Sequence, residues 1–520
     1  MSAVKSFIDY KAKTGMQCGS YFIDLPPLKE GEQYRFHFDA TKCIGCHCCE
    51  VACNEQNNNP SDIKWRRVGE MEGGEFPNTL LLFLSMSCNH CIDPACLKGC
   101  PTNAYEKMDN GIVFHHDDVC IGCQYCTWNC PYDVPVFHEE RHIVTKCHMC
   151  YDRIENGQTP ACVQACPEGA IEIEAVNVKE WVERDMKKEG NAPNLVDVEI
   201  TKATTRYTLP KDMPKNLKPM DSELVKPAHK ELPLVFMTVL TQISLIGFIA
   251  LFLGDLAGSF TSLPKPDFSM AFTIFLLSAI GLPLSALHLG RPILAISAMK
   301  NVKTSWLSRE ALALGVFTAL MGIVSLMYYF EVDGFLRFLV EFVGIVVGVY
   351  GIYAQSMIYR VPAKPTWNRI TTTYRFFSTG YIATAILAFI ALLKGYGNVS
   401  DILLSFSILL GSLQIYLFFE SQRFYENNED YVVKRAKKLL EDNFGIFYKF
   451  RKISLPLGAV VFPLFAIVSI NAGSDMLGYV FIVLSILTAF LSELVGRMLF
   501  YSTALKTGLP GNFFAGSQRG

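Results

Sequence analysis

Sixteen of the eighteen cysteines in this 520-residue chain are confined to residues 43–166, where they form four groups of four. In the first and third groups, two, two and three residues separate successive cysteines; the spacings are two, four and three in the second group and two, eleven and three in the fourth. A segment so rich in thiols and loops has to fold around whatever the thiols bind, because binding supplies much of its folding free energy. The groups are Cys43, Cys46, Cys49 and Cys53; Cys88, Cys91, Cys96 and Cys100; Cys120, Cys123, Cys126 and Cys130; and Cys147, Cys150, Cys162 and Cys166.

These spacings are typical of iron–sulfur binding. Runs of two, two and three residues with a trailing Cys-Pro pair hold one [4Fe–4S] cluster through three thiolates, while the last cysteine ligates a neighbouring cluster. Sixteen thiolates predict four [4Fe–4S] clusters and therefore electron transfer. Disulfides are less suitable, since they are typical of small secreted chains and residues 1–15 contain no apolar leader segment. Zinc remains a weaker alternative, because it does not account for the triplets.

Short strands surround the cysteine groups. Apolar residues alternate in residues 34–38 and 111–115, and each segment is followed by the same tetrapeptide, Cys-Ile-Gly-Cys. The glycines of this tetrapeptide, Gly45 and Gly122, allow backbone N–H groups to approach cluster sulfurs. The pattern predicts an α+β, ferredoxin-like double repeat. Cys18 and Cys48 do not fit the spacing and are expected to be unligated thiols.

The chain changes character after about residue 230, where long apolar segments replace the polar, cysteine-rich half. Each of eight segments is long enough to cross a bilayer as a helix, which predicts an all-α polytopic membrane domain and makes a soluble helical domain improbable. The net charge of −2 gives no indication of nucleic-acid binding. The expected spans are residues 234–256, 268–289, 311–330, 338–359, 376–393, 403–419, 453–470 and 477–500.

Lysine and arginine concentrate on one side of these spans. The segment before the first span and the loops after the second, fourth and sixth spans are rich in Lys and Arg, whereas the opposite loops contain only Lys265, Arg337 and Lys394. Because positively charged loops stay in the cytoplasm, the cysteine-rich half is predicted on the cytoplasmic side of the inner membrane. The expected domains are residues 1–180 for the clusters, 181–231 for a linker that is extended over residues 209–226, 232–503 for the anchor and 504–520 for a tail.

The order and spacing of the cysteines, with Trp65-Arg66-Arg67-Val68 between the first two groups, resemble the four-cluster iron–sulfur subunit of DMSO-reductase-type molybdenum enzymes. The resemblance covers residues 30–180. It implies that the first and fourth groups share two clusters and that the second and third groups share the other two. The implied ligand sets are Cys43, Cys46, Cys49 and Cys166; Cys147, Cys150, Cys162 and Cys53; Cys88, Cys91, Cys96 and Cys130; and Cys120, Cys123, Cys126 and Cys100.

The membrane half resembles the eight-helix anchor subunit of DMSO reductase. The matching motifs are His288-Leu289-Gly290-Arg291-Pro292, Ser305-Trp306-Leu307-Ser308-Arg309-Glu310, Pro365-Thr366-Trp367-Asn368 and Glu493-Leu494-Val495-Gly496-Arg497. The resemblance implies that His288 and Glu310, with Arg291, border a quinone site.

A histidine and a carboxylate at the membrane edge suit proton exchange, although His288 and Glu310 could instead cap helix ends or pair with Arg291 and Arg309. Glu341 and Gln355 could line the same cavity as His288 and Glu310. Glu493 and Arg497 are expected to form a structural ion pair, and residues 426–442 a surface helix.

The resemblance implies a fused electron-transfer and membrane-anchor subunit of a quinone-linked molybdopterin oxidoreductase. It would exchange electrons between menaquinol or ubiquinol and a separate molybdopterin-containing catalytic subunit, without being catalytic itself. A sulfite-oxidising-type complex with electrons running to quinone also fits the predicted cytoplasmic side. A free-standing relay without a molybdenum partner stays open as well. Transport is disfavoured, because the membrane half shows no paired helices interrupted by Gly and Pro.

Overall fold

The computed structural model describes residues 25–221, 227–228, 231–505 and 509. They form two compact units that divide between residues 224 and 225. Cys18 lies outside the described residues, as does almost all of the predicted tail.

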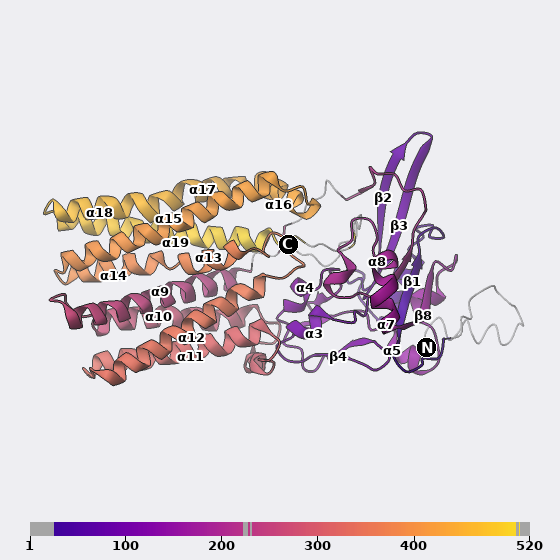
Figure 1. Ribbon diagram of the computed structural model, residues 1–520, viewed down its shortest axis with the longest axis horizontal. Coiled ribbons are helices and arrows are strands. Elements are labelled where there is room, and N and C mark those ends of the chain that lie inside the picture. The colour runs from indigo at the N-terminus through magenta and orange to yellow at the C-terminus, as the bar shows by residue number, and fades with distance from the viewer. Residues whose placement is uncertain (1–24, 222–226, 229–230, 506–508, 510–520) are drawn as a thin grey trace, which may run out of the picture. The chain divides into compact units, whose positions relative to one another are not determined.

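Two small sheets and two hairpins make up the first unit (Figure 1). The alternating segment at residues 34–38 is a strand, as predicted, and forms the middle strand of the first sheet. The segment at residues 111–115 is a strand only in its second half. The first sheet contains β8 (Ile171–Asn177), β1 (Glu32–Asp39) and β9 (Arg206–Thr208). The second contains β10 (Lys218–Pro219), β2 (Arg67–Glu75) and β3 (Asn78–Met86). The hairpins are β4 (Tyr105–Lys107) with β5 (Val113–His115), and β6 (Val136–His138) with β7 (Ile143–Thr145).

Short helices accompany the cysteine groups. Each lies within or directly after a group, so that one turn of helix fixes the direction of neighbouring thiols. They are α2 (Cys48–Asn57), α3 (Ala95–Gly99), α4 (Tyr125–Asn129), α5 (Tyr151–Glu155) and α6 (Ala161–Gln164).

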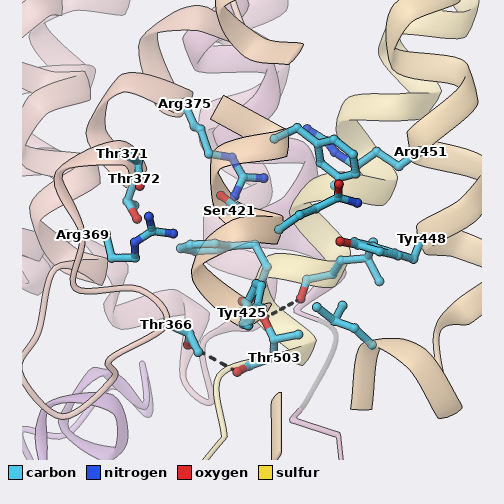
Figure 2. Close-up of a pocket in the computed structure, with 16 residues that line it drawn as sticks. Thr366, Arg369, Thr371, Thr372, Arg375, Ser421, Tyr425, Tyr448, Arg451 and Thr503 are labelled. Carbon is cyan, nitrogen blue, oxygen red and sulfur yellow. Dashed lines mark hydrogen bonds between the residues drawn. The ribbon is translucent and has the colours of Figure 1, made fainter. Parts of the chain in front are cut away.

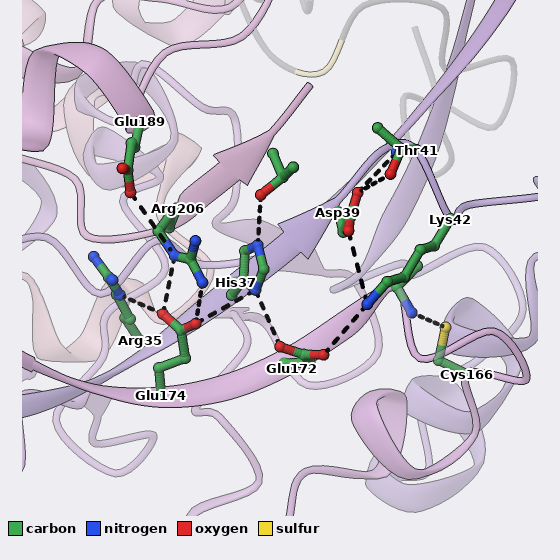
Figure 3. Close-up of polar contacts among 12 residues, drawn as sticks. Arg35, His37, Asp39, Thr41, Lys42, Cys166, Glu172, Glu174, Glu189 and Arg206 are labelled. Carbon is green, nitrogen blue, oxygen red and sulfur yellow. Dashed lines mark hydrogen bonds and ion pairs between the residues drawn. The ribbon is translucent and has the colours of Figure 1, made fainter. Parts of the chain in front are cut away.

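Two short strands of the first unit lie within residues 181–231, the range expected to be a linker. Strand β9 pairs in parallel with β1, and β10 pairs with β2. Polar contacts across the first sheet accompany this pairing (Figure 3). His37 Nε2 lies 2.9 Å from Thr208 Oγ1, and the guanidinium of Arg206 pairs with Glu174 on β8. The sequence pattern did not indicate these strands, because each is only two or three residues long.

The second unit is a bundle of eight helical spans, which confirms the predicted number (Figure 1). Most helices extend a turn or more beyond the apolar segments, because polar residues continue the helix past the apolar core. The helices are α9 (Leu232–Phe260), α10 (Phe268–Leu284), α11 (Trp306–Tyr329), α12 (Phe335–Tyr359), α13 (Ile370–Ser378) with α14 (Tyr381–Leu393), α15 (Gly397–Asn427), α17 (Gly445–Pro456) with α18 (Phe462–Asn471), and α19 (Asp475–Ser502).

The bundle has an apolar outer surface and a partly polar interior. Leucine, isoleucine, valine and phenylalanine side chains are exposed along most of its helices, as expected for contact with lipid. Helix α9 lies innermost, since 78% of its most apolar stretch is buried against other helices. The predicted surface helix is α16 (Tyr431–Asp442), which buries Val433, Ala436 and Leu439.

Candidate functional site

Four thiols that are distant in sequence surround one cavity of the first unit. Cys166 comes from the fourth cysteine group, whereas its three neighbours come from the first. The backbone N–H of Ala170 donates to the Cys166 thiol at 3.2 Å (Figure 3), and the N–H of Gly45 donates to the thiol of Cys43. The thiols that line the cavity are those of Cys43, Cys46, Cys49 and Cys166.

A second cavity brings together the second and third groups. Three of its thiols come from the second group and one from the third. The side chain of Lys146 also lines this cavity, with Nζ 3.8 Å from the sulfur of Cys88. The thiols that line it are those of Cys88, Cys91, Cys96 and Cys130.

The remaining eight cysteines also lie near one another in two sets. Burial raises the pKa of the Cys53 thiol well above its usual value, and the neighbouring thiolates of the fourth group add to the effect. Burial and the thiolates of its neighbours raise the pKa of Cys126 in the same way. The neighbours of Cys53 are Cys147, Cys162 and Cys150, and those of Cys126 are Cys123, Cys120 and Cys100.

Left-handed backbone shapes the loops that present these thiols. Gly45 and Gly122 both have φ of 68°, a conformation that glycine adopts without steric cost. At Gly122 the turn aims the backbone N–H at the sulfur of Cys120, 3.4 Å away. His47 and Gln124 then adopt left-handed conformations directly before α2 and α4. The repeated tetrapeptide therefore gives the first and third groups the same local fold.

The donor sets fit a metal cluster better than they fit free thiols. Burial raises the pKa of Cys49, Cys91 and Cys150 to about 12, so four adjoining buried thiols would not ionise without a positively charged partner. Iron supplies that charge, and each set contains the four sulfur ligands that a cubane cluster requires.

Sequence reasoning missed three cations that lie near these thiols, of which Lys146 and Arg66 are buried and Lys107 is partly buried. Lys146 donates to the backbone carbonyls of Val113 and Cys147. Lys107 donates to the carbonyl of Cys91 at 2.8 Å. Nothing in the spacing of either lysine signals that it lies beside the thiols.

Arg66 is the third of these cations, and it belongs to the motif Trp65-Arg66-Arg67-Val68, to which the sequence assigned no role. Its guanidinium donates to Ser85 Oγ at 3.1 Å and Ser87 Oγ at 2.9 Å. Burial alone would lower the pKa of Arg66, but the thiolates of Cys162 and Cys49 outweigh this effect and raise it. The negative charge of adjoining thiolates therefore holds the guanidinium in the core.

Of the two unassigned cysteines, only Cys48 lies among the described residues. It is exposed at the start of α2, and it lines neither of the two cavities described above.

In the membrane unit, the predicted quinone residues lie on neighbouring elements. His288 ends the short helix η3 (Ser285–His288), which packs against α9 and against η4 (Pro292–Met299). Glu310 lies in the second turn of α11, which also packs against η4, and is 7% exposed. Arg291 directly precedes η4 and is half-buried. Among the described contacts, none links the side chains of His288 and Glu310 directly.

Glu310 adjoins a buried chain of polar groups. Its carboxyl group lies beside the side-chain amide of Gln355. The Nε2 group of Gln242 donates to Gln355 Oε1 at 2.7 Å, and Arg497 donates to Gln242 Oε1 at 2.8 Å. A polar path therefore connects α11, α12, α9 and α19 in the bundle interior, which is an arrangement that an intramembrane proton or ligand site requires.

Two expectations for this region are wrong. Glu493 pairs with Arg451 at 3.3 Å and accepts from Gln414 at 2.9 Å, whereas Arg497 turns to Gln242 on α9. Packing against different helices therefore overrides the spacing that would favour a pair within α19. Of the two residues expected to line a cavity with His288 and Glu310, Gln355 does adjoin Glu310. The expectation for Glu341 is wrong, because fourteen residues of α12 separate it from Gln355 by about 21 Å along the helix.

Comparisons with known proteins agree with these two units. Residues 226–503 match the family model of the DMSO reductase anchor subunit (DmsC), and residues 79–176 match a 4Fe-4S dicluster domain. A polypeptide of the anaerobic dimethyl sulfoxide reductase of Haemophilus influenzae is 41% identical over 155 residues, which are 28% of this chain and 76% of that protein. Its counterpart in the Escherichia coli enzyme is 42% identical over 149 residues, 27% of this chain and 73% of that protein.

A relative from another complex is also similar. One of the subunits of the sulfite dehydrogenase of Allochromatium vinosum is 38% identical over 154 residues, 25% of this chain and 64% of that protein. Each of the three relatives matches about a quarter of this chain, whereas the DmsC model covers the membrane unit. The chain belongs to the DMSO reductase anchor subunit family and joins that multi-pass membrane domain to a [4Fe–4S] electron-transfer domain.

Proposed function

We propose that this chain carries electrons between a membrane quinone and a separate molybdopterin-containing catalytic subunit, through four [4Fe–4S] clusters. The grouping of the sixteen cysteines carries the proposal, since each set combines thiols from two distant groups. When bound, the clusters supply one-electron carriers. The chain's own contribution is to hold them with buried thiolates and to surround those thiolates with buried cations and backbone N–H donors.

Iron analysis tests the number of clusters. Four complete thiol sets predict about sixteen iron atoms per chain in protein purified without oxygen. Replacing Cys96 with Ser should remove one ligand of one set and lower the iron content or change the cluster type, while Cys48→Ser, a matched change of an exposed cysteine, should leave iron unchanged. About eight iron atoms, or stoichiometric zinc, would contradict the proposal.

The quinone site of the proposal is bordered by His288, Arg291 and Glu310. Quinol oxidation releases two protons with two electrons, so the site needs groups that accept protons beside the electron acceptor. An imidazole and a carboxylate at the end of two spans supply such groups. The chain Glu310–Gln355–Gln242 adds polar partners that reach the bundle interior.

Cluster reduction by a quinol analogue tests this site. His288→Ala and Glu310→Gln should slow reduction at least tenfold, while iron content and membrane insertion stay at the wild-type level. Glu341→Gln is the matched control, because it removes another buried carboxylate of the bundle that lies far from Gln355 along α12. Equal reduction rates in wild-type protein, His288→Ala, Glu310→Gln and Glu341→Gln would place the quinone elsewhere.

The catalytic partner is tested by purification. A tag on this chain should recover a large molybdopterin-containing subunit together with the clusters. Recovery of the chain alone, with full quinol-linked cluster reduction, would favour a free-standing relay.

A further inference from the structure

A basic cavity lies inside the helical unit, and none of the residues assigned to the quinone lines it. It is enclosed by α13, α15, α16, α17 and α19 and contains about 570 Å³ of empty space, part of it open to solvent. Its lining includes three arginines and no aspartate or glutamate. Figure 2 shows Arg369 and Arg375 reaching toward the cavity from the α13 side and Arg451 from the α17 side. We call this feature the arginine cavity.

Two of these arginines have acidic partners outside the cavity. Arg369 pairs with Glu420 and lies over the ring of Phe424, at 3.9 Å from its centre. Arg451 pairs with Glu493 at 3.3 Å. Their positive charges are therefore partly balanced by residues that do not line the cavity.

Arg375 is different. Within the described part of the chain, its guanidinium makes no hydrogen bond to an acceptor and no salt bridge, although it is only partly exposed. Arg451 also keeps one buried nitrogen, Nε, without a hydrogen-bond partner. A guanidinium without a hydrogen-bonded acceptor in a partly enclosed cavity is unfavourable unless an anion accompanies it. The arginine cavity is therefore built for a negatively charged group.

The position and lining of the cavity indicate what that group is. It lies where α13 and α17 begin and α15 and α19 end, which is one end of the membrane spans. Hydroxyl side chains such as Tyr448 share the lining with apolar ones such as Phe418 and Leu499. Arginine binds phosphate oxygens through two parallel hydrogen bonds, and basic pockets between spans recognise anionic lipid head groups.

Helix α17 borders both the cavity and the outer surface of the bundle. On α17, Ile446 and Phe450 are 83% and 41% exposed on the outer surface of the bundle, while Tyr448 and Arg451 of the same helix line the cavity. The helix thus presents an apolar face to acyl chains and a polar face to a head group. We propose that the arginine cavity binds the phosphate group of an anionic phospholipid through Arg375, with Arg369 and Arg451 beside it.

Native mass spectrometry of the full chain in detergent tests this proposal. Phosphatidylglycerol, phosphatidylcholine and inorganic phosphate are titrated separately against each protein. Arg375→Gln removes the unpaired charge of the cavity. Arg423→Gln is the matched control, because it removes an exposed arginine from α15, next in sequence to the cavity residue Gln422.

We expect one phosphatidylglycerol to bind wild-type protein and Arg423→Gln with equal affinity, and Arg375→Gln at least tenfold more weakly. Phosphatidylcholine and inorganic phosphate should each bind wild-type protein at least tenfold more weakly than phosphatidylglycerol. Equal binding of phosphatidylglycerol to Arg375→Gln and wild-type protein would overturn the proposal. Inorganic phosphate binding as tightly as the lipid would assign the cavity to a free anion and overturn the lipid assignment.

A second pair of variants keeps the test decisive if Arg375→Gln does not fold, as judged from its membrane insertion and its monodispersity in detergent. Arg375→Lys keeps the charge but loses the paired hydrogen bonds, and should bind phosphatidylglycerol severalfold more weakly. Tyr448→Phe removes only a hydroxyl group of the lining and should also weaken binding. Unchanged affinity in both variants would overturn the role of the cavity.

Discussion

The buried amine of Lys146 gives the sharpest prediction about the clusters. Its side chain is almost fully buried and donates to two backbone carbonyls, while Nζ lies 3.8 Å from the sulfur of Cys88. An ammonium group here favours the reduced, more negative cluster. Lys146→Gln removes this charge but keeps a hydrogen-bond donor for the carbonyls, so we expect the reduction potential of the cluster held by Cys88 to fall.

The structure sets the scale of the effect. Two unit charges at the observed 3.8 Å interact by about 4 kcal/mol at an effective dielectric constant of about 20. This is an upper bound, because the added electron is spread over the cluster. Half of it, about 2 kcal/mol, corresponds to about 90 mV for a one-electron couple. The predicted change is therefore a fall of about 90 mV.

Potentiometric titration followed by electron paramagnetic resonance measures this shift. Lys98→Gln is the matched control, because Lys98 lies between Cys96 and Cys100 of the second group but is 57% exposed and paired with Asp93. Water screens its charge, so the potentials in this variant should stay within about 20 mV of the wild-type values. A shift of equal size in both variants, or none in Lys146→Gln, would refute the electrostatic role of Lys146.

Two further predictions concern sidedness and acid stability. A reporter fused after Gly520 should be active in the cytoplasm, since eight spans return the chain to its starting side; activity in the periplasm would contradict the orientation. Burial alone would raise the pKa of Glu174, but Arg206 and Arg35 outweigh this effect and lower it. Glu174 therefore stabilises the fold above its unfolded pKa, and this contribution is lost as pH falls through the folded pKa. Between neutral and acid pH, Glu174→Gln should lose less stability than wild-type protein, as measured by the urea midpoint of unfolding at decreasing pH. Equal losses of stability in the two proteins would contradict the role of the Glu174 carboxylate.

The fold was largely predictable because its determinants are local. Cysteine spacing sets which loops hold thiols, and a run of about twenty apolar residues suffices to predict a span. Strand β9 could not be predicted in this way. Its three residues become a strand only through contacts with β1 and Glu174, which are distant in sequence.

The membrane interior was less predictable for the same reason. The spacing of Glu493 and Arg497 favours a pair on one helix, yet each side chain faces a different neighbouring helix and finds its partner there. Arg375 and Arg451 were counted as loop charges that set orientation. The structure places both within helices, where they line the arginine cavity. Positive charge near a span end therefore indicates sidedness without revealing whether the side chain points outward or inward.

The tight turn at Gly45 provides a final test of how the loops present their thiols. A Cβ atom added to Gly45 would lie 2.4 Å from the ring of Phe83, and the residue has φ of +68°. Gly157 has the same φ of +68°, but a Cβ atom there would meet nothing within 4 Å. Gly157→Ala therefore measures the cost of left-handed backbone alone, about 1–2 kcal/mol.

Gly45→Ala adds a steric conflict to the same backbone cost. Overpacking of this kind contributes about 1–3 kcal/mol more, and displacement of the loop moves the N–H that donates to Cys43. We expect both variants to unfold at lower temperature than wild-type protein, with the larger decrease and a loss of iron in Gly45→Ala only. If the two variants lose equal stability and both retain their iron, the ring of Phe83 has moved aside, and close packing over Gly45 is not required to hold the cluster loop.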